Sequence, residues 1–227
     1  MLKQSRLDAL ADGIFAIVMT LLVIELRIPE IYQYATETEL SHFLIENLPL
    51  FISYMLSFTL LFVYWRAHHY IASVLARNLD QRLAAINAFF LMLIALVPFS
   101  THFLGAFSYS QIAIIFYGGN MVLISLTLLW MRLYIRDSQT IDNMPVDHDS
   151  EVRGMMRIIM PALMAAAAIG LSFINTRWSL LLFLTAIFFN LSDSSRFVYR
   201  VFKKLNTLLN IGPSQPEKKK PTTKKSK

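Results

Sequence analysis

Charged residues stand in the opening turns of a long apolar segment, "RLDALADGIFAIVMTLLVIELRIP", which runs from residue 6 to residue 29. They are Arg6, Asp8 and Asp12. A charge inside a bilayer is costly, so such a residue faces the interior of a helix bundle or water and has a polar partner. Because Asp8 and Asp12 are one helical turn apart, we expect both carboxylates on one face of a helix.

Candidate partners lie in "YWRAHHY", residues 64–70, which contains Trp65, His68 and His69. Asn87 is expected at a similar depth in a later segment. One interpretation is that these polar groups hold three helices together. The other is a proton relay or a gate sensor, because histidine titrates near physiological pH. The two interpretations are compatible, and the sequence leaves both open.

Most other chemistry is excluded by composition and spacing. The chain has no cysteine, which rules out disulfides, thiolate metal sites and cysteine nucleophiles. Its five histidines show no metal-binding spacing, and the adjacent pair His68 and His69 would point about 100° apart on a helix. The sequence also has no Gly-rich phosphate loop and no nucleophile elbow. We therefore expect no enzyme, no resident metal and no cofactor.

The elements that must position these residues are membrane helices. Of the 227 residues, 56% are hydrophobic and 16% are charged. A helix needs about 20 mostly apolar residues to cross a bilayer, and its backbone groups must pair within the segment. We predict an all-α polytopic membrane protein with six transmembrane helices. The predicted spans lie at about 7–28, 47–67, 83–104, 109–134, 155–175 and 178–200.

Basic residues are unevenly distributed between the connections. Nineteen lysines and arginines fall on one side of the predicted spans, and only Arg27 and Arg177 fall on the other. Because cytoplasmic connections carry this excess, we expect a multi-pass protein of the cell membrane with both termini in the cytoplasm.

Two regions follow from this organisation: a six-helix membrane domain over residues 1–205 and a basic tail over residues 206–227. The last eleven residues hold six lysines, so we expect a disordered tail that is attracted to anionic lipid headgroups. A polybasic tail can also indicate nucleic-acid binding. The membrane context favours the cytoplasmic surface tail, with no nucleic acid as a partner.

The first predicted span has two distinct sides on a helical wheel. Asp8 and Asp12 mark one side, near the start of the helix. Three aliphatic residues with a four-then-three spacing lie about 140° or more around from it. They are Ile17, Leu21 and Ile24, and the hydroxyl of Thr20 borders them. Such a stripe is typical of lipid or packing contacts, and periodicity alone cannot select a pore face.

The same span resembles the first span of the transmembrane protein 175 family, the lysosomal potassium channels and their bacterial relatives. That family carries Arg, three variable residues and Phe-Ser-Asp, followed by an aliphatic helix and a Pro-bounded loop. Arg6 and Asp12 match this pattern, while Leu10 and Ala11 stand where Phe and Ser are usual. The resemblance continues through "WRAHHY" at 65–70 and "RNLDQRLAAINAFFLMLIALVPFSTHFLG" at 77–105. It covers nearly the whole membrane region.

The resemblance implies a homotetramer in which helix 1 of each subunit lines the pore, without a re-entrant selectivity filter. The implied pore constriction consists of Ile17, Leu21 and Ile24, with Thr20 as the pore hydroxyl. The implied inter-helix polar network consists of Arg6 and Asp12, joined by His69 and Asn87.

The resulting hypothesis is a potassium-preferring passive cation channel with a hydrophobic gate and K⁺ as the permeant ion. A narrow aliphatic ring expels water and gates by dewetting, and potassium gives up hydration water more readily than sodium. The alternatives are a proton-leak channel through the same pore, a secondary transporter and a non-conducting scaffold. A transporter would need midplane charges or broken helices. Bi-ionic recording of the purified protein separates these functions.

Overall fold

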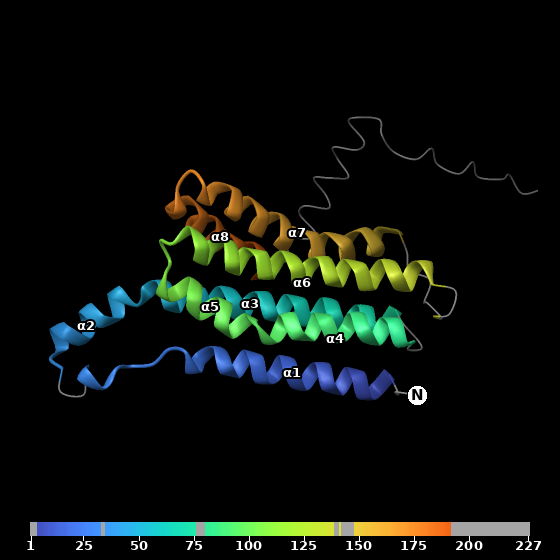
Figure 1. Cartoon of the computed structure of the whole chain (residues 1–227), viewed down its shortest axis with the longest axis horizontal. Coiled ribbons are helices and arrows are strands. Elements are labelled where there is room, and N and C mark those ends of the chain that lie inside the picture. The colour runs from blue at the N-terminus through green and yellow to red at the C-terminus, as the bar shows by residue number, and fades with distance from the viewer. Residues whose placement is uncertain (1–3, 33–34, 76–79, 139–140, 142–147, 192–227) are drawn as a thin grey trace, which may run out of the picture.

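The computed structural model describes residues 4–32, 35–75, 80–138, 141 and 148–191, and the regular structure within them is helical. The helices are α1 (Gln4–Ile24), η1 (Glu30–Tyr32), α2 (Glu37–Glu46), α3 (Leu48–His69), η2 (Tyr70–Leu75), α4 (Gln81–Ala95), α5 (Val97–Ala106), α6 (Gln111–Asp137), α7 (His148–Ser172) and α8 (Thr176–Leu191). Except for α2 and the short η1, they form a bundle of roughly aligned rods (Figure 1).

Five helices in the described part of the chain are long and apolar enough to cross a membrane. They are Gln4–Ile24, Leu48–Ala72, Gln81–Ala106, Gln111–Asp137 and Gly154–Ser172, and they correspond to the first five predicted spans. The sixth predicted span, 178–200, begins within α8 and continues past Leu191, where the described residues end. The predicted tail, 206–227, also lies outside the described residues.

The first helix is shorter than the predicted span at its C-terminal end, because α1 ends at Ile24 and not at residue 28. Pro29 disfavours helical backbone at Ile28, so the helix does not continue to residue 28. The guanidinium of Arg27 then donates from Nε to the Ile24 carbonyl at 3.2 Å, which satisfies one of the last carbonyls of α1.

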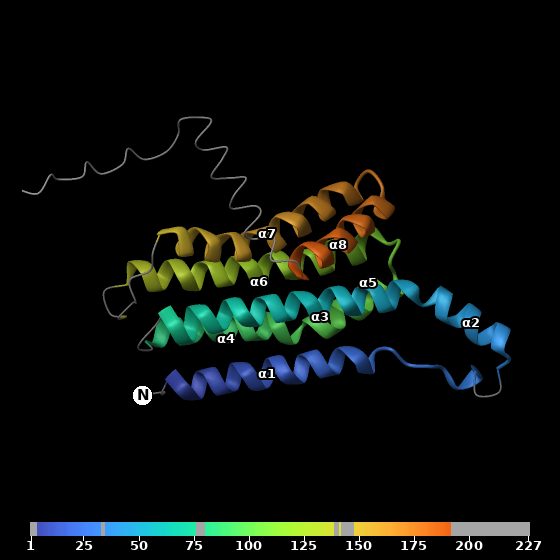
Figure 2. The ribbon, with the colours of Figure 1, turned by 180° about the vertical axis from the view of Figure 1, so that it is seen from behind.

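Between the first two spans, the expected connection contains a further helix, α2, which projects from the end of the bundle (Figures 1 and 2). A capping box begins it. The backbone N–H and the hydroxyl of Thr36 donate to the Glu39 carboxylate at 2.7 and 2.8 Å, and Glu39 N–H donates back at 3.4 Å. These two donors, the backbone N–H first, hold the pKa of Glu39 below its usual range.

The third predicted span is divided into α4 and α5 by a break at Leu96. Pro98 causes the break, since it has no N–H to donate to the Ile94 carbonyl and its ring clashes with that carbonyl. The Leu96 N–H instead bonds to the Leu93 carbonyl at 3.3 Å, one residue closer than in an α-helix.

Helix α6 lies at the centre of the bundle and packs against α4, α5 and α7. Its side chains Tyr117, Leu128 and Met131 are fully buried. Where α6 meets α7, a Cβ on Gly118 would lie 2.9 Å from Ile169 Cγ1, so a side chain there would force the two helices apart. Small residues permit this close approach of membrane helices.

Helix α1, by contrast, lies at one edge of the bundle (Figures 1 and 2). It packs against α3, α4 and α5. Its buried residues recur on one face, at Leu7, Ala11, Phe15, Val18 and Leu22. The opposite face of α1 therefore has no neighbour within the described chain.

Candidate pore face and inter-helix contacts

The uncovered face of α1 carries the aliphatic residues singled out in the sequence. Ile17 is 59% exposed, Leu21 41% and Ile24 48%. Their neighbours Val18 and Leu22 are buried at 4% and 1% on the other face. A single chain thus leaves an apolar stripe along one side of a membrane-length helix.

Thr20 lies on the exposed side of α1, between Ile17 and Ile24 in sequence. Its hydroxyl donates to backbone carbonyls of its own helix, at 2.8 Å to Ile17 and 3.1 Å to Ala16. Because the hydroxyl hydrogen is used within the helix, the free lone pair of Oγ1 makes Thr20 an acceptor. An acceptor beside an aliphatic stripe can offer an oxygen ligand to a cation.

The start of α1 is joined to the end of α3 through Asp12. The indole Nε1 of Trp65 donates to Asp12 Oδ1 at 2.8 Å. The ring of Trp65 stacks on His69, with centroids 6.0 Å apart and planes 25° apart. Asp12 and His69 are therefore connected through Trp65, one turn before His69 on the same face of α3.

A second polar contact joins α3 to α4. His68 Nε2 donates to Asn87 Oδ1 at 2.6 Å, and both side chains are buried. The imidazole stacks on Phe90 at 5.0 Å with nearly parallel rings, and Phe15 of α1 packs against both rings. Three helices therefore meet around His68.

The structure thus brings some predicted network residues together and leaves one outside. Asp12 and His69 share Trp65, whereas Asn87 contacts His68 rather than His69. Arg6 is exposed, and no hydrogen bond or ion pair joins it to another residue that the structure describes.

Asp8 behaves differently from Asp12. Its Oδ1 is shielded from solvent and has no hydrogen-bond partner among the described residues.

The position of each residue around α3 decides which of the adjacent histidines, His68 or His69, contacts Asn87. The buried residues of α3 include Ser57, Leu61, Tyr64 and His68, which recur at three- and four-residue intervals. That pattern places His68 in the core and turns His69 away from it. Reading this periodicity along the whole span would have assigned the core contact to His68.

Arginines are unevenly distributed between the two ends of the bundle. We call the end where α1 begins the arginine-rich end. Its described arginines include Arg6, Arg66, Arg82, Arg132, Arg136 and Arg157. We call the opposite end the α2 end. Its carboxylates are Glu25, Glu30, Glu37, Glu39 and Glu46, with Arg27 and Arg177 as its described arginines.

Three comparisons with known proteins agree on one family. Residues 6–98, which run from the start of α1 to the start of α5, match the family described as endosomal/lysosomal potassium channel TMEM175. A potassium channel of Chamaesiphon minutus is 30% identical over 135 residues, which are 58% of this chain and 64% of that protein. A potassium channel of Streptomyces collinus is 27% identical over 76% of this chain and 84% of its own length.

A solved structure is also similar to this chain. The crystal structure of a lysosomal potassium-selective channel TMEM175 homolog from Chamaesiphon minutus aligns with a TM-score of 0.67 and 26% identity. The alignment covers 82% of this chain and 95% of that one. In sequence, the chain spans less than two thirds of the first two relatives, at 64% for Chamaesiphon and 59% for a Chryseobacterium potassium channel. The family resemblance predicted from the first span is confirmed.

Proposed function

Since this chain belongs to the TMEM175 family through residues 6–98, we propose that it is a potassium-preferring passive cation channel. In this proposal, four copies assemble around a central axis and α1 of each copy lines the pore. Three relatives are named potassium channels, which supports the choice of ion.

One observation carries the proposal: α1 turns Ile17, Leu21 and Ile24 away from its own bundle. A helix packed on one face only can meet its own copies along the other. Four such faces around an axis form three stacked aliphatic rings. Lipid could cover the same stripe, so the experiment must distinguish lipid contact from a pore.

The three aliphatic rings could open and close the pore without a selectivity filter made of backbone carbonyls. A narrow apolar neck sheds water, and a dry neck is a barrier to any ion. A slight widening lets a partly hydrated cation pass, which favours potassium because it loses hydration water at lower cost than sodium. The four Thr20 oxygens then replace part of the lost water, and we expect weaker selectivity than a carbonyl filter gives.

Polar contacts behind the rings hold α1 in place. The Trp65–Asp12 hydrogen bond fixes the start of α1 on α3, and the His68–Asn87 contact fixes α3 on α4. We propose that Arg6 and His69 complete this network in the assembled channel, with Arg6 reaching a neighbouring copy.

The distribution of arginines supports an orientation with both termini in the cytoplasm of the cell. Arginines concentrate at the end where α1 begins, as the positive-inside rule requires of the cytoplasmic side. The carboxylates of the α2 end would then raise the local cation concentration at the outer mouth. The basic tail, in the cytoplasm, would contact anionic lipid headgroups.

Replacing Ile17 by alanine tests the proposal. A wider first ring should raise cation flux in proteoliposomes at least about tenfold, the change expected for about 1.4 kcal/mol off the barrier. The bi-ionic reversal potential should also move toward zero, because a wider neck discriminates less between potassium and sodium. The control is Val18→Ala, which shortens the neighbouring side chain on the buried face of α1. It should lower thermal stability and leave the reversal potential unchanged. Equal flux in Ile17→Ala and wild type would contradict the proposal.

A further inference from the structure

We propose that Glu25 and His102 form a positioning pair that sets the aperture of the outermost ring, at Ile24. The inference rests on the proposed pore. It adds that an ionisable contact to α5 holds the end of α1. The charge of this contact, which lies outside the aliphatic rings, then changes the width of the pore at Ile24.

The pair lies directly beside the outermost ring. Helix α1 ends at Ile24, and Glu25 is the next residue. The carboxylate Oε2 of Glu25 approaches His102 Nδ1 at 3.2 Å. The two atoms are not aligned as a hydrogen bond, and Nδ1 is otherwise shielded without a partner among the described residues. The contact therefore depends on charge, and it is strongest when His102 is protonated.

The α5 side of the pair is fixed to the bundle. A Cβ on Gly105 would lie 2.8 Å from the Leu50 Cα, so α5 and α3 touch backbone to backbone. Next to His102, the Thr101 hydroxyl donates to Ser57 Oγ at 2.7 Å, and Ser57 pairs with Tyr117 of α6 at 2.9 Å. The imidazole is thus held on a helix locked to two others. In this proposal, the end of α1 is the part that moves relative to it.

The ionisable groups around His102 come from two other elements. Arg27, which follows α1, and Glu46, which ends α2, line the same cavity of about 560 Å³ as Glu25 and His102. The lining residues from the start of α3 and from α5 add no further charge. The side chains of His102 and Glu25 are 46% and 37% exposed, so protons from the solution at the α2 end reach the pair.

The geometry gives the effect a direction. Helix α5 contacts α1 from the bundle side, whereas Ile24 faces away from the bundle. A stronger pair holds the end of α1 back against α5 and keeps Ile24 away from the axis. Acidification at the α2 end should therefore widen the neck and raise potassium conductance. A half-exposed ion pair supports a change of about twofold to fivefold.

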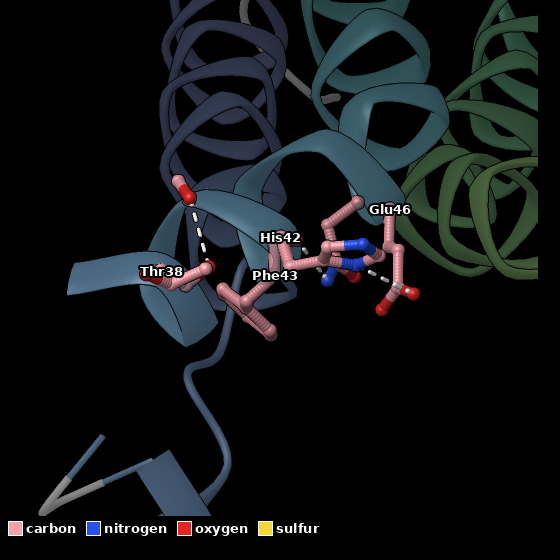
Figure 3. Close-up of polar contacts among 6 residues, drawn as sticks. Thr38, His42, Phe43 and Glu46 are labelled. Atoms are coloured by element: carbon pink, nitrogen blue, oxygen red, sulfur yellow. Dashed lines mark hydrogen bonds and ion pairs between the residues drawn. The ribbon is translucent and has the colours of Figure 1, made fainter. Parts of the chain in front are cut away.

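A second histidine at the same end provides a matched control. His42 Nδ1 lies 3.2 Å from Glu46 Oε1, one turn away within α2 (Figure 3). This pair has the same chemistry and the same distance, and it stands on a helix that projects from the bundle. His42 does not line the cavity that holds Glu25 and His102, so its protonation does not act directly on that contact. His42→Gln should therefore leave the pH response intact.

The experiment uses purified full-length channels in planar bilayers, with each side acidified in turn. Glu25→Gln and His102→Gln should each lower potassium conductance at acidic pH about twofold to fivefold and flatten its pH profile. The exchange variant Glu25→His with His102→Glu should restore both. A reporter, Ile24→Cys in this cysteine-free chain, should react more slowly with a water-soluble thiol reagent when His102→Gln is added.

The results separate this inference from the proposed function. If wild type conducts potassium but the glutamine variants keep its pH profile and thiol reactivity, the positioning pair is wrong and the channel stands. Lost conductance that the exchange variant does not restore also overturns the pairing. If the wild type shows no conductance when either side of the bilayer is acidified, the proposed channel function is wrong, whatever the variants do.

Discussion

Single side chains divide the surface of α1 into a face that holds the helix and a face that has no neighbour. Asp12 belongs to the first role, since it accepts from Trp65 Nε1 at 2.8 Å. Ile17 belongs to the second, at 59% exposure. Asp12 and Ile17 are five residues apart, and successive residues of an α-helix turn by about 100°. The two side chains therefore lie on different sides of the same helix.

Replacing Asp12 by alanine should loosen α1 from α3. A hydrogen bond to a charged group contributes about 1.5–3 kcal/mol, and the exposed position of Asp12 places its share toward the lower end. We expect that less of the proposed tetramer stays intact after heating in detergent, measured by size-exclusion chromatography. Asp12→Asn is the control, because its amide oxygen still accepts from the indole. Equal losses in the alanine and asparagine variants would show that the hydrogen bond is not the cause.

For single residues, the sequence predicted which side chains belong to the site more reliably than it predicted which of them contact each other. A helical wheel separated Ile17, Leu21 and Ile24 from the acidic side, because the period of an α-helix is regular. It could not select Trp65 as the partner of Asp12, 53 positions away, since that contact depends on how α1 and α3 pack. The contact between Glu25 and His102 had no local signal for the same reason.

The elements show where short-range chemistry decides structure. Five predicted spans appear as apolar helices because each has the length that a bilayer requires. Helix α2 was missed, although its signal is present in Thr36 and Glu39, a capping-box spacing. The break at Leu96 likewise has a local cause, the missing N–H of Pro98.

The capping box makes the stability of α2 depend on pH. Glu39 has a lowered pKa in the folded chain, so its contribution is fully present above the usual glutamate value of about 4.3. It is lost as pH falls further, through the lower folded pKa. Hydrogen exchange of residues 37–46 should therefore quicken at acidic pH, relative to the other helices. In Glu39→Gln, which keeps an acceptor without a charge, this acid-dependent loss should be absent. Its persistence there would exclude Glu39 as the cause.

Two glycines test helix approach with one kind of substitution. A Cβ at Gly105 would lie 2.5 Å from the Leu50 Cδ1 and 2.8 Å from its Cα. At Gly119, a Cβ would have no atom of another described element within 4 Å. Gly105→Ala should cost about 1–3 kcal/mol through overpacking and lower the Tm in detergent. Gly119→Ala should leave the Tm unchanged or raise it, because alanine favours the helix. A smaller loss for Gly105 than for Gly119 would contradict the close α3–α5 packing.

The whole molecule is asymmetric in a way that a single chain does not explain. Helices α6 and α7 pack closely together, while α1 lies at the edge with an aliphatic face uncovered. Most of the described arginines lie at one end of the same bundle. The proposed channel gives these features a common explanation, a shared axis between copies. Composition and hydropathy predicted the bundle, but the number of copies around the axis is beyond what one chain can specify.

The most direct test of that axis compares adjacent residues on opposite faces of α1. Ile17→Cys and Val18→Cys each introduce the sole thiol of the chain, at positions that are 59% and 4% exposed. Silver ion, a permeant-sized cation that binds thiolates, is added while potassium current is recorded across a bilayer. The account predicts irreversible loss of current in Ile17→Cys and unchanged current in Val18→Cys and wild type. Unchanged current in a conducting Ile17→Cys channel would contradict it, because the residue would then lie outside the ion path.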